Sequence, residues 1–278
     1  MSPETDGPRP LPAHIAASLA RSANPAASGN LADSAGQPWA GRHFDGNDFG
    51  DDDGSAPERL IRALAEFRAG SVAADAVVDA MRGVRLLIPL VAQLGEAGLD
   101  EHGRTVDKTQ ELAIVTVEAP DGRAALPVFS SVTAMQAWNA TARPVPADGV
   151  RVALAAAGEQ TDLVVLDPTS DTEFAVRRPA VWAMAKSEPW RPPHADPVVR
   201  EAFDASIGTE LGVIGIDLLA GDADARLAGP ELIVQLRLVQ GLTEAELDAV
   251  LARLAQRWAS DDVIATRVDS LGVQLLPS

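Results

Sequence analysis

The spacing of apolar side chains predicts helices and strands that begin at Ser55. Ser55-Ala56-Pro57-Glu58 has the form of a capping box, and the apolar positions after it recur at helical spacing until Gly70. A second helix is predicted to end near Gly83. Short apolar runs then predict strands over 84–92, 111–118, 126–129, 163–166 and 174–176, and helices are expected over about 132–138, capped by Ser130 and Ser131, and from Pro179.

The C-terminal part shows the clearest pattern. Prolines crowd residues 188–197, which excludes a helix or a central strand there, and Asp196-Pro197 then begins a helix through Phe203. Strands are predicted over 213–219, 231–239 and 273–276, with a helix that starts at the capping box Thr243–Glu246. This β-β-α-β order implies one sheet with a helix on one face.

These elements predict an α+β protein with three segments. Residues 1–54 form a disordered tail and an extended arm, because they carry few large apolar side chains and many Pro, Ala, Ser and Gly residues. Residues 55–205 form an N-terminal domain with a mixed sheet and flanking helices, and residues 206–278 form a smaller β-β-α-β domain.

Charge and composition exclude several classes of protein. The formal net charge of −17 disfavours nucleic acids and anionic membranes as partners, because both attract clusters of Lys and Arg. The strongest apolar run, 86–92, is too short to cross a bilayer, and the first residues do not resemble a signal peptide. The chain contains no cysteine, which fits a reducing compartment. We therefore expect a cytoplasmic protein.

No motif predicts catalysis, a metal or a cofactor. His14, His43, His102 and His194 are not spaced as metal ligands, and the strand-to-helix turn at Ser130-Ser131 lacks the glycines of a nucleophile elbow. The acidic stretch 45–54 fails the EF-hand pattern in both registers, so we interpret it as a solvated linker. Enzymatic activity stays open, and the absence of a reactive constellation argues against it.

Candidate binding residues lie in three segments of the chain. Trp39, Arg42 and Phe44 lie in the arm, where packing against the chain's own folded part is favoured over a partner-binding motif. Trp190 lies in the proline-rich loop and serves equally well as an interface anchor or as packing between domains. Two arginines and a histidine are candidates for an anionic ligand, or else solvated charges: Arg177, Arg178 and His194. The remaining tryptophans at 138, 182 and 258 are expected in the core.

Several segments resemble one known family. Leu126-Pro-Val-Phe-Ser-Ser131, Arg143-Pro-Val-Pro146, Leu163-Val-Val-Leu-Asp-Pro168 and Phe174-Ala-Val-Arg-Arg-Pro179 are similar to the SseB family, named for enhanced sensitivity to serine. Trp138-Asn139, Pro189-Trp190, Trp39-Ala-Gly-Arg42 and Asp52-Asp-Gly54 extend the resemblance over about residues 39–278. It implies a cytoplasmic, bacterial α+β protein, without an established reaction or catalytic residues.

Three functions remain in competition. The first is a non-catalytic module that acts through contacts with an unidentified protein, linked by the resemblance to amino-acid (serine) metabolism. The second is a sensor of an amino acid or another anion, or an enzyme of unrecognised class, with a pocket between the domains. The third is self-association into a homo-oligomer through the edge of strand 231–239.

Overall fold

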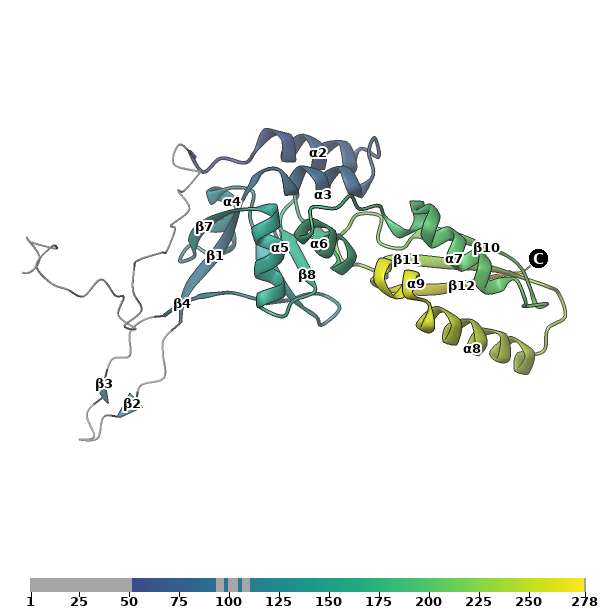
Figure 1. Ribbon diagram of the computed structural model, residues 1–278. Coiled ribbons are helices and arrows are strands. Elements are labelled where there is room, and N and C mark those ends of the chain that lie inside the picture. The colour runs from purple at the N-terminus through teal and green to yellow at the C-terminus, as the bar shows by residue number, and fades with distance from the viewer. Residues whose placement is uncertain (1–51, 94–97, 100–104, 107–110, 278) are drawn as a thin grey trace, which may run out of the picture. The chain divides into compact units, whose positions relative to one another are not determined.

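The computed structural model describes residues 52–93, 98–99, 105–106 and 111–277 of the chain. Its helices are α2 (Glu58–Arg68), α3 (Ala74–Arg82), α4 (Val132–Trp138), α5 (Gly149–Gly158), α6 (Arg178–Ala185), α7 (Pro197–Ile207), α8 (Glu244–Ser260) and α9 (Asp262–Arg267), with a 3₁₀ turn η1 (Pro193–Ala195) (Figure 1). The strands are β1 (Arg85–Gln93), β2 (Gly98–Leu99), β3 (Thr105–Val106), β4 (Glu111–Ile114), β5 (Val117–Glu118), β6 (Ala124–Val128), β7 (Arg143–Asp148), β8 (Leu163–Leu166), β9 (Phe174–Val176), β10 (Val213–Ala220), β11 (Leu232–Leu238) and β12 (Leu271–Pro277).

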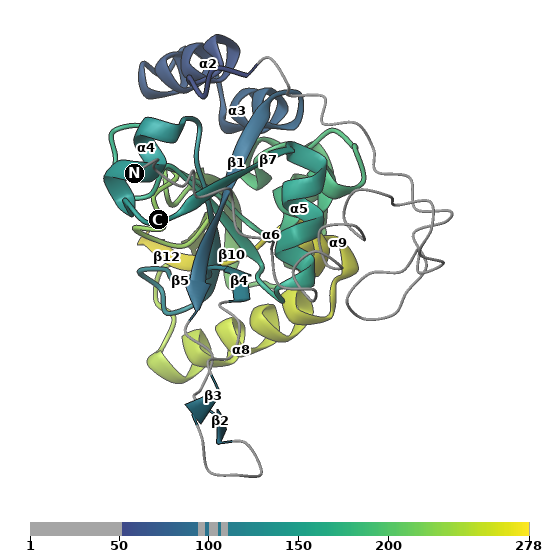
Figure 2. The ribbon, with the colours of Figure 1, turned by 90° about the vertical axis from the view of Figure 1, so that its left-hand side faces the viewer.

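The N-terminal half contains two sheets joined by a bridge. β1 pairs antiparallel with β4 and β7, and Figure 2 shows β1 and β7 side by side with α5 next to them. The second sheet has the order β5-β6-β8-β9, in which β6 and β8 are parallel and the outer pairs are antiparallel. Leu87 and Phe129 exchange two backbone hydrogen bonds of 2.9 Å between β1 and the end of β6. The predicted mixed sheet is confirmed.

The largest hydrophobic core of this half combines side chains of α2, α3, α5 and α6 with those of β1, β6, β8 and β9, and two smaller clusters lie beside it. Helix α2 packs through the apolar Leu60 and Leu64 on its buried face. Phe67 continues that face and meets Phe174 edge-on, with 5.3 Å between ring centroids. Helix α2 therefore packs against β9.

The C-terminal half confirms the predicted β-β-α-β order. β10 pairs antiparallel with β11, and β12 returns parallel to β11 after α8 and α9. Alternate residues of β10 and β11 form a second core with α7, α8 and α9, in which Phe203 of α7 meets Trp258 of α8 with 5.3 Å between ring centroids. The capping box at Thr243 is formed as predicted. The expectation that strand 231–239 offers an edge for self-association is wrong, because β11 pairs with β10 on one side and with β12 on the other.

Other local predictions also fail where tertiary contacts decide the structure. The capping box predicted at Ser55 does not form: Pro57 is the N-cap of α2, while the Ser55 carbonyl oxygen accepts a hydrogen bond from Arg85. The strand predicted over 111–118 is divided, because β4 pairs with β1 and β5 pairs with β6 in the other sheet.

The solvated linker also needs correction at its C-terminal end. Asp52, with a side chain 21% exposed, forms an ion pair of 2.7 Å with the buried Arg85. The same guanidinium donates a 2.8 Å hydrogen bond to the Ser130 carbonyl oxygen. This segment is therefore attached to the strand ends of the N-terminal half. None of the helices described is long and apolar enough to span a membrane.

Candidate functional site

In the C-terminal sheet, the end of β10 lies beside the starts of β11 and β12. β10 ends at Ala220, which pairs with Leu232 at the start of β11. Leu232 also pairs with Leu271 at the start of β12, because β11 and β12 are parallel. The residues immediately outside these three strand ends are therefore neighbours in space, although as many as fifty positions of sequence separate them.

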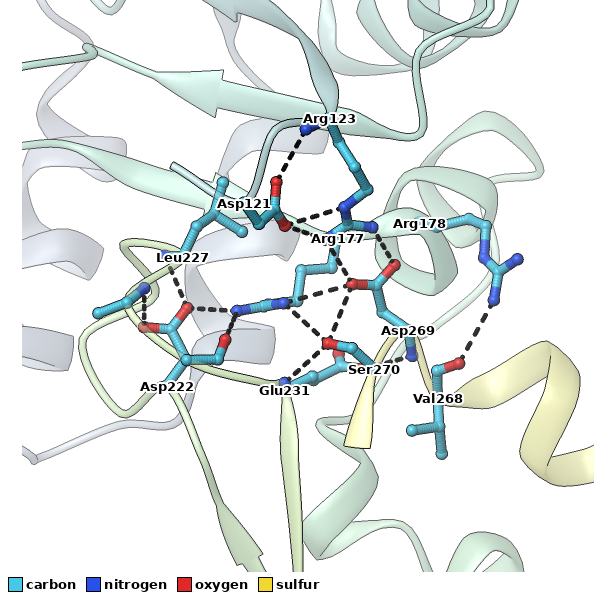
Figure 3. A network of polar contacts seen from close by, with 12 residues as sticks. Asp121, Arg123, Arg177, Arg178, Asp222, Leu227, Glu231, Val268, Asp269 and Ser270 are labelled. Carbon is cyan, nitrogen blue, oxygen red and sulfur yellow. Dashed lines mark hydrogen bonds and ion pairs between the residues drawn. The ribbon is translucent and has the colours of Figure 1, made fainter. Parts of the chain in front are cut away.

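Polar side chains occupy these flanking positions (Figure 3). Glu231 precedes β11, and its carboxylate oxygen Oε2 accepts a 2.7 Å hydrogen bond from the backbone N–H of Asp269. In return the Glu231 backbone N–H donates a 3.0 Å hydrogen bond to Ser270 Oγ. Asp222 follows β10, and its carboxylate accepts hydrogen bonds from the backbone N–H groups of residues 226–228, at 2.8–3.3 Å. The loop and strand ends thus hold two carboxylates in fixed positions.

Arg177 from the N-terminal half completes the network. It lies between β9 and α6, is 6% exposed, and donates to Asp222 Oδ2 at 2.6 Å and to the Gly229 carbonyl oxygen at 2.8 Å (Figure 3). Its other terminal nitrogen donates to Ser270 Oγ at 3.2 Å and to Asp269 Oδ2 at 3.3 Å. One guanidinium therefore ties all three C-terminal strand ends to the N-terminal half.

A second arginine joins the network from the turn between β5 and β6. Arg123 donates to both carboxylate oxygens of Asp269, each at 2.9 Å, and also to Asp121 at 2.7 Å. The side chain of Asp269 is 1% exposed. Burial alone would raise the pKa of Asp269, but the hydrogen bonds and charges of Arg123 and Arg177 lower it below its usual range. Asp269 is therefore a carboxylate near neutral pH, paired with two guanidinium groups.

A pocket of about 180 Å³ lies beside this network. Its apolar wall comes mainly from the N-terminal half and the proline-rich loop, and includes Phe67, Phe174 and Trp190. Its polar wall includes Arg177, Asp222, Glu231 and His194. Mostly apolar pockets with a few convergent polar groups are typical small-molecule sites.

Two groups in the pocket titrate abnormally. Burial raises the pKa of Glu231 to about 7, and the neighbouring Asp269 carboxylate adds to the rise, while the hydrogen bond from the Asp269 N–H opposes it. Burial lowers the pKa of His194, so its imidazole is neutral at pH 7. Perturbed acids and bases that share a pocket mark candidate functional sites.

The structure brings three of the predicted site residues to this pocket: Arg177, Trp190 and His194. Arg177 is not the solvated charge that the sequence allowed, because it is buried and its hydrogen bonds are used within the protein. Arg178 is directed to the carbonyl oxygens of Ala265 and Val268, at 3.3 and 3.4 Å. Trp39, Arg42 and Phe44 lie outside the described residues.

The tryptophans expected in the core differ from one another. Trp258 is 5% exposed and confirms the prediction. Trp138 is half-buried and lies 5.3 Å from the Phe129 ring. The prediction is wrong for Trp182, which is 45% exposed and carries the Arg178 guanidinium 5.5 Å from its ring centroid. The apolar residues beside Trp182 in the sequence indicated burial, but the indole lies on the outer face of α6.

A second buried polar cluster lies at the carboxyl ends of the parallel strands β6 and β8. Asp167 is 1% exposed and accepts hydrogen bonds from Ser130 N–H at 2.8 Å, Ser130 Oγ at 2.7 Å and Thr172 Oγ1 at 2.8 Å. Ser131, not Ser130, caps α4. Because the Ser130 hydroxyl donates to a carboxylate and no described histidine contacts it, the cluster connects strand ends rather than activating a nucleophile. The described residues include no group of metal-binding side chains.

Sequence reasoning missed the acidic half of the site. Asp222, Glu231 and Asp269 belong to no motif, and each stands alone beside a strand end. Only the register of three strands brings them together, so no local signal identifies them. Acidic residues that flank strands of one sheet on the same side are the one weak indication the sequence contains.

Comparison with known proteins identifies a domain in the N-terminal half of the chain. No curated protein and no solved structure shows a significant match to the chain. Residues 60–183 match the SseB protein N-terminal domain. That range contains β1 to β9 and Arg177, so the guanidinium at the pocket lies inside the family domain and its acidic partners lie beyond it. Residues 60–183 are therefore an SseB N-terminal domain.

Proposed function

We propose that this protein is a non-catalytic regulatory module that senses a small ligand in the pocket beside Arg177. The observation that carries the proposal is the composition of the pocket wall, to which both halves of the fold contribute. Phe67 and Phe174 come from the N-terminal half, whereas Asp222 and Glu231 come from the C-terminal half. A ligand that contacts both halves stabilises their association, because binding only to the assembled state shifts the folding equilibrium.

The biological setting is also part of the proposal. The family is named for a serine-sensitive growth phenotype, and this supports a role near amino-acid metabolism in a bacterial cytoplasm. A sensor would transmit occupancy of the pocket through the contact between the halves, which Arg177 holds together. No residue of the pocket is required to make or break a bond in this proposal.

A thermal-shift panel on the full chain tests the sensor. Amino acids, amines, carboxylates, nucleotides and divalent cations are added separately to the wild type and to Ala223→Phe, which places a large side chain at an exposed position of the pocket wall. Ala228→Phe is the matched control, because residue 228 is exposed in the same connection and does not line the pocket. At one hundred times its dissociation constant a ligand should stabilise the protein by about 2.7 kcal/mol.

The variants separate pocket binding from other effects. We expect at least one class of ligand to raise the melting temperature of the wild type and of Ala228→Phe but not of Ala223→Phe. A panel without any shift in the wild type would refute the sensor, and so would a shift that Ala223→Phe retains in full.

A protein partner is the second candidate function, supported by the surface around Trp182. Trp182 and Val198 are 45% and 41% exposed, and both line a groove of about 590 Å³ that Trp190 also borders. Exposed tryptophan beside arginine is enriched where interfaces concentrate binding energy. Affinity capture from the native cytoplasm, with the variants Trp182→Ala and Leu154→Ala alongside, tests this function. A partner lost with Trp182→Ala but kept with Leu154→Ala, which is 56% exposed on α5, would support it.

A further inference from the structure

Glu231 has an unused carboxylate oxygen in the pocket. The residue is 9% exposed, and its Oε2 accepts the Asp269 backbone N–H. Within the part of the chain that the structure describes, no donor reaches the other oxygen, Oε1, although Glu231 lines the pocket. A carboxylate oxygen that lines a pocket and that no described protein donor reaches is open to a ligand, so a ligand that donates there gains a charge-assisted hydrogen bond.

The charges around the pocket favour a cation. Three guanidinium groups act on the carboxyl groups of Asp121, Asp222, Asp269 and Glu231: those of Arg123 and Arg177 through hydrogen bonds, and that of Arg178 through its charge on Glu231 (Figure 3). When every carboxyl group is ionised, the set carries one uncompensated negative charge. Because His194 is half-buried and neutral, it does not supply the missing positive charge. A ligand with a single positive charge would balance the site.

Anions meet the opposite situation. The two terminal nitrogens of Arg177 already donate to Asp222, Gly229, Asp269 and Ser270. An anion could bind this guanidinium only by displacing carboxylates that are themselves buried, which would leave those charges unpaired. Neither terminal nitrogen of Arg177 is therefore available to an anion, and the unpartnered buried donor that the described pocket wall offers, the Trp190 indole N–H, carries no charge.

The apolar wall limits the size of the ligand and its type. Phe67, Phe174 and Trp190 offer aromatic surface, which attracts alkyl groups and also the faces of cations. A cavity of about 150 Å³ is large enough to hold benzene, and this pocket measures about 180 Å³. The ligand should thus have about six or seven non-hydrogen atoms, one end charged and the other aliphatic.

The geometry points to a small organic ammonium ion as the ligand of this pocket, with its N–H groups donating to Glu231 Oε1 and its alkyl chain against the aromatic wall. This inference rests on the proposed sensor function and specifies the chemistry of that site. A free amino acid fits less well, because its carboxylate would lie beside Asp222 with no available cation.

Three probes of one shape test the charge preference by isothermal titration calorimetry on the full chain at pH 8. They are 3-methylbutylamine as the cation, 3-methylbutanol as the neutral analogue and 3-methylbutanoate as the anion. Charge-assisted hydrogen bonds exceed neutral ones, so the amine should bind about ten-fold or more tighter than the alcohol, and the anion weakest. Glu231→Gln should bring the amine to the affinity of the alcohol without changing the alcohol itself, whereas Glu201→Gln, at an exposed position of α7, should change neither.

Each result decides a different question. If the alcohol or the anion binds as tightly as the amine, the pocket is a ligand site but the ammonium inference is wrong. If the amine binds tightest and Glu231→Gln keeps that preference, Glu231 is not the recognition group and the inference fails. If none of the three probes binds while another class in the thermal-shift panel does, the inference fails and the sensor stands. If neither experiment detects a ligand, both fail.

Discussion

Replacing Arg177 by Met should destabilise the fold by about 3 kcal/mol, the lower end of the range for removing one partner of a buried ion pair. Methionine keeps most of the length of the side chain and removes the guanidinium, which is 6% exposed and donates four hydrogen bonds. The Asp222 side chain, 3% exposed, then has no cation, and the Gly229 carbonyl oxygen loses its donor. The loss is expected at the lower end because Asp269 keeps Arg123 and Asp222 keeps its backbone donors.

Equilibrium unfolding in urea, followed by far-ultraviolet circular dichroism at pH 7.5, measures this loss. Because the two halves have separate cores, the data are fitted with an intermediate wherever the transitions separate. Arg237→Met is the control, because it removes a 3.4 Å ion pair with Asp217 in which the two side chains are 52% and 43% exposed. An exposed pair contributes less than about 1 kcal/mol.

A double variant examines the cause. Arg177→Met with Asp222→Leu removes both charges, and replacing a buried pair by apolar side chains is often close to neutral, so part of the lost stability should return. The reasoning would be refuted if Arg177→Met cost less than about 1 kcal/mol, the range of an exposed pair. It would also be refuted if the two substitutions were simply additive, because residues in direct contact should couple.

Three further predictions address other parts of the molecule. The pKa of Glu231 rises from 4.5 to about 7 on folding, so the folded state holds its proton longer and the free energy of unfolding falls as pH rises from 4.5 to 7. In urea melts, Glu231→Gln should therefore recover about 3 kcal/mol at pH 8 and change nothing at pH 4. An unchanged pH profile of the free energy of unfolding would contradict this. Gly149→Ala should lower the free energy of unfolding by about 1–3 kcal/mol, because its new methyl group would lie 2.5 Å from a backbone oxygen of α3. The control Gly158→Ala meets nothing within 4 Å and should lose no stability. Equal melting temperatures of the two variants would count against the close approach. Asp167→Asn should cost about 2 kcal/mol in the same urea assay, because an amide presents one acceptor oxygen to donors that used two, and the exposed Asp171→Asn should stay within about 0.5 kcal/mol.

The matched SseB N-terminal domain supplies only part of the pocket wall. The matched domain ends at residue 183, before Trp190, His194 and the acidic residues of the C-terminal strands. The apolar part of the pocket thus belongs largely to the family domain, whereas Glu231 does not. In the proposed sensor, ligand specificity would therefore depend on the C-terminal half.

Much of the fold is determined by local sequence. The capping box at Thr243 and the alternation along β11 lie within a few residues of the structures they predict, and both are confirmed. Helix α4 is likewise capped by Ser131, as its position after an apolar strand indicated. In each case the physical cause is a hydrogen bond or a periodic apolar face inside one element, so the sequence of that element is sufficient.

Elements that depend on distant partners were not determined in this way. β7 contains two prolines and follows no alternating pattern, yet it pairs with β1 along its whole length. Helix α5 is rich in alanine and packs closely because Gly149 admits the backbone of α3. Ser55 resembled a helix cap but its carbonyl oxygen is held by Arg85, thirty residues later. Long-range contacts outweighed local preference at each of these positions.

The candidate site shows the same division. The sequence by itself indicated Arg177, Trp190 and His194 as unusual residues, because charge and aromatic side chains in loops stand out locally. Their acidic counterparts Asp222 and Glu231 were decided only by tertiary structure, since the registers of β10, β11 and β12 carry them to one end of the sheet. Strand register depends on pairing between distant segments, and that pairing turns isolated charges into one buried network beside a pocket.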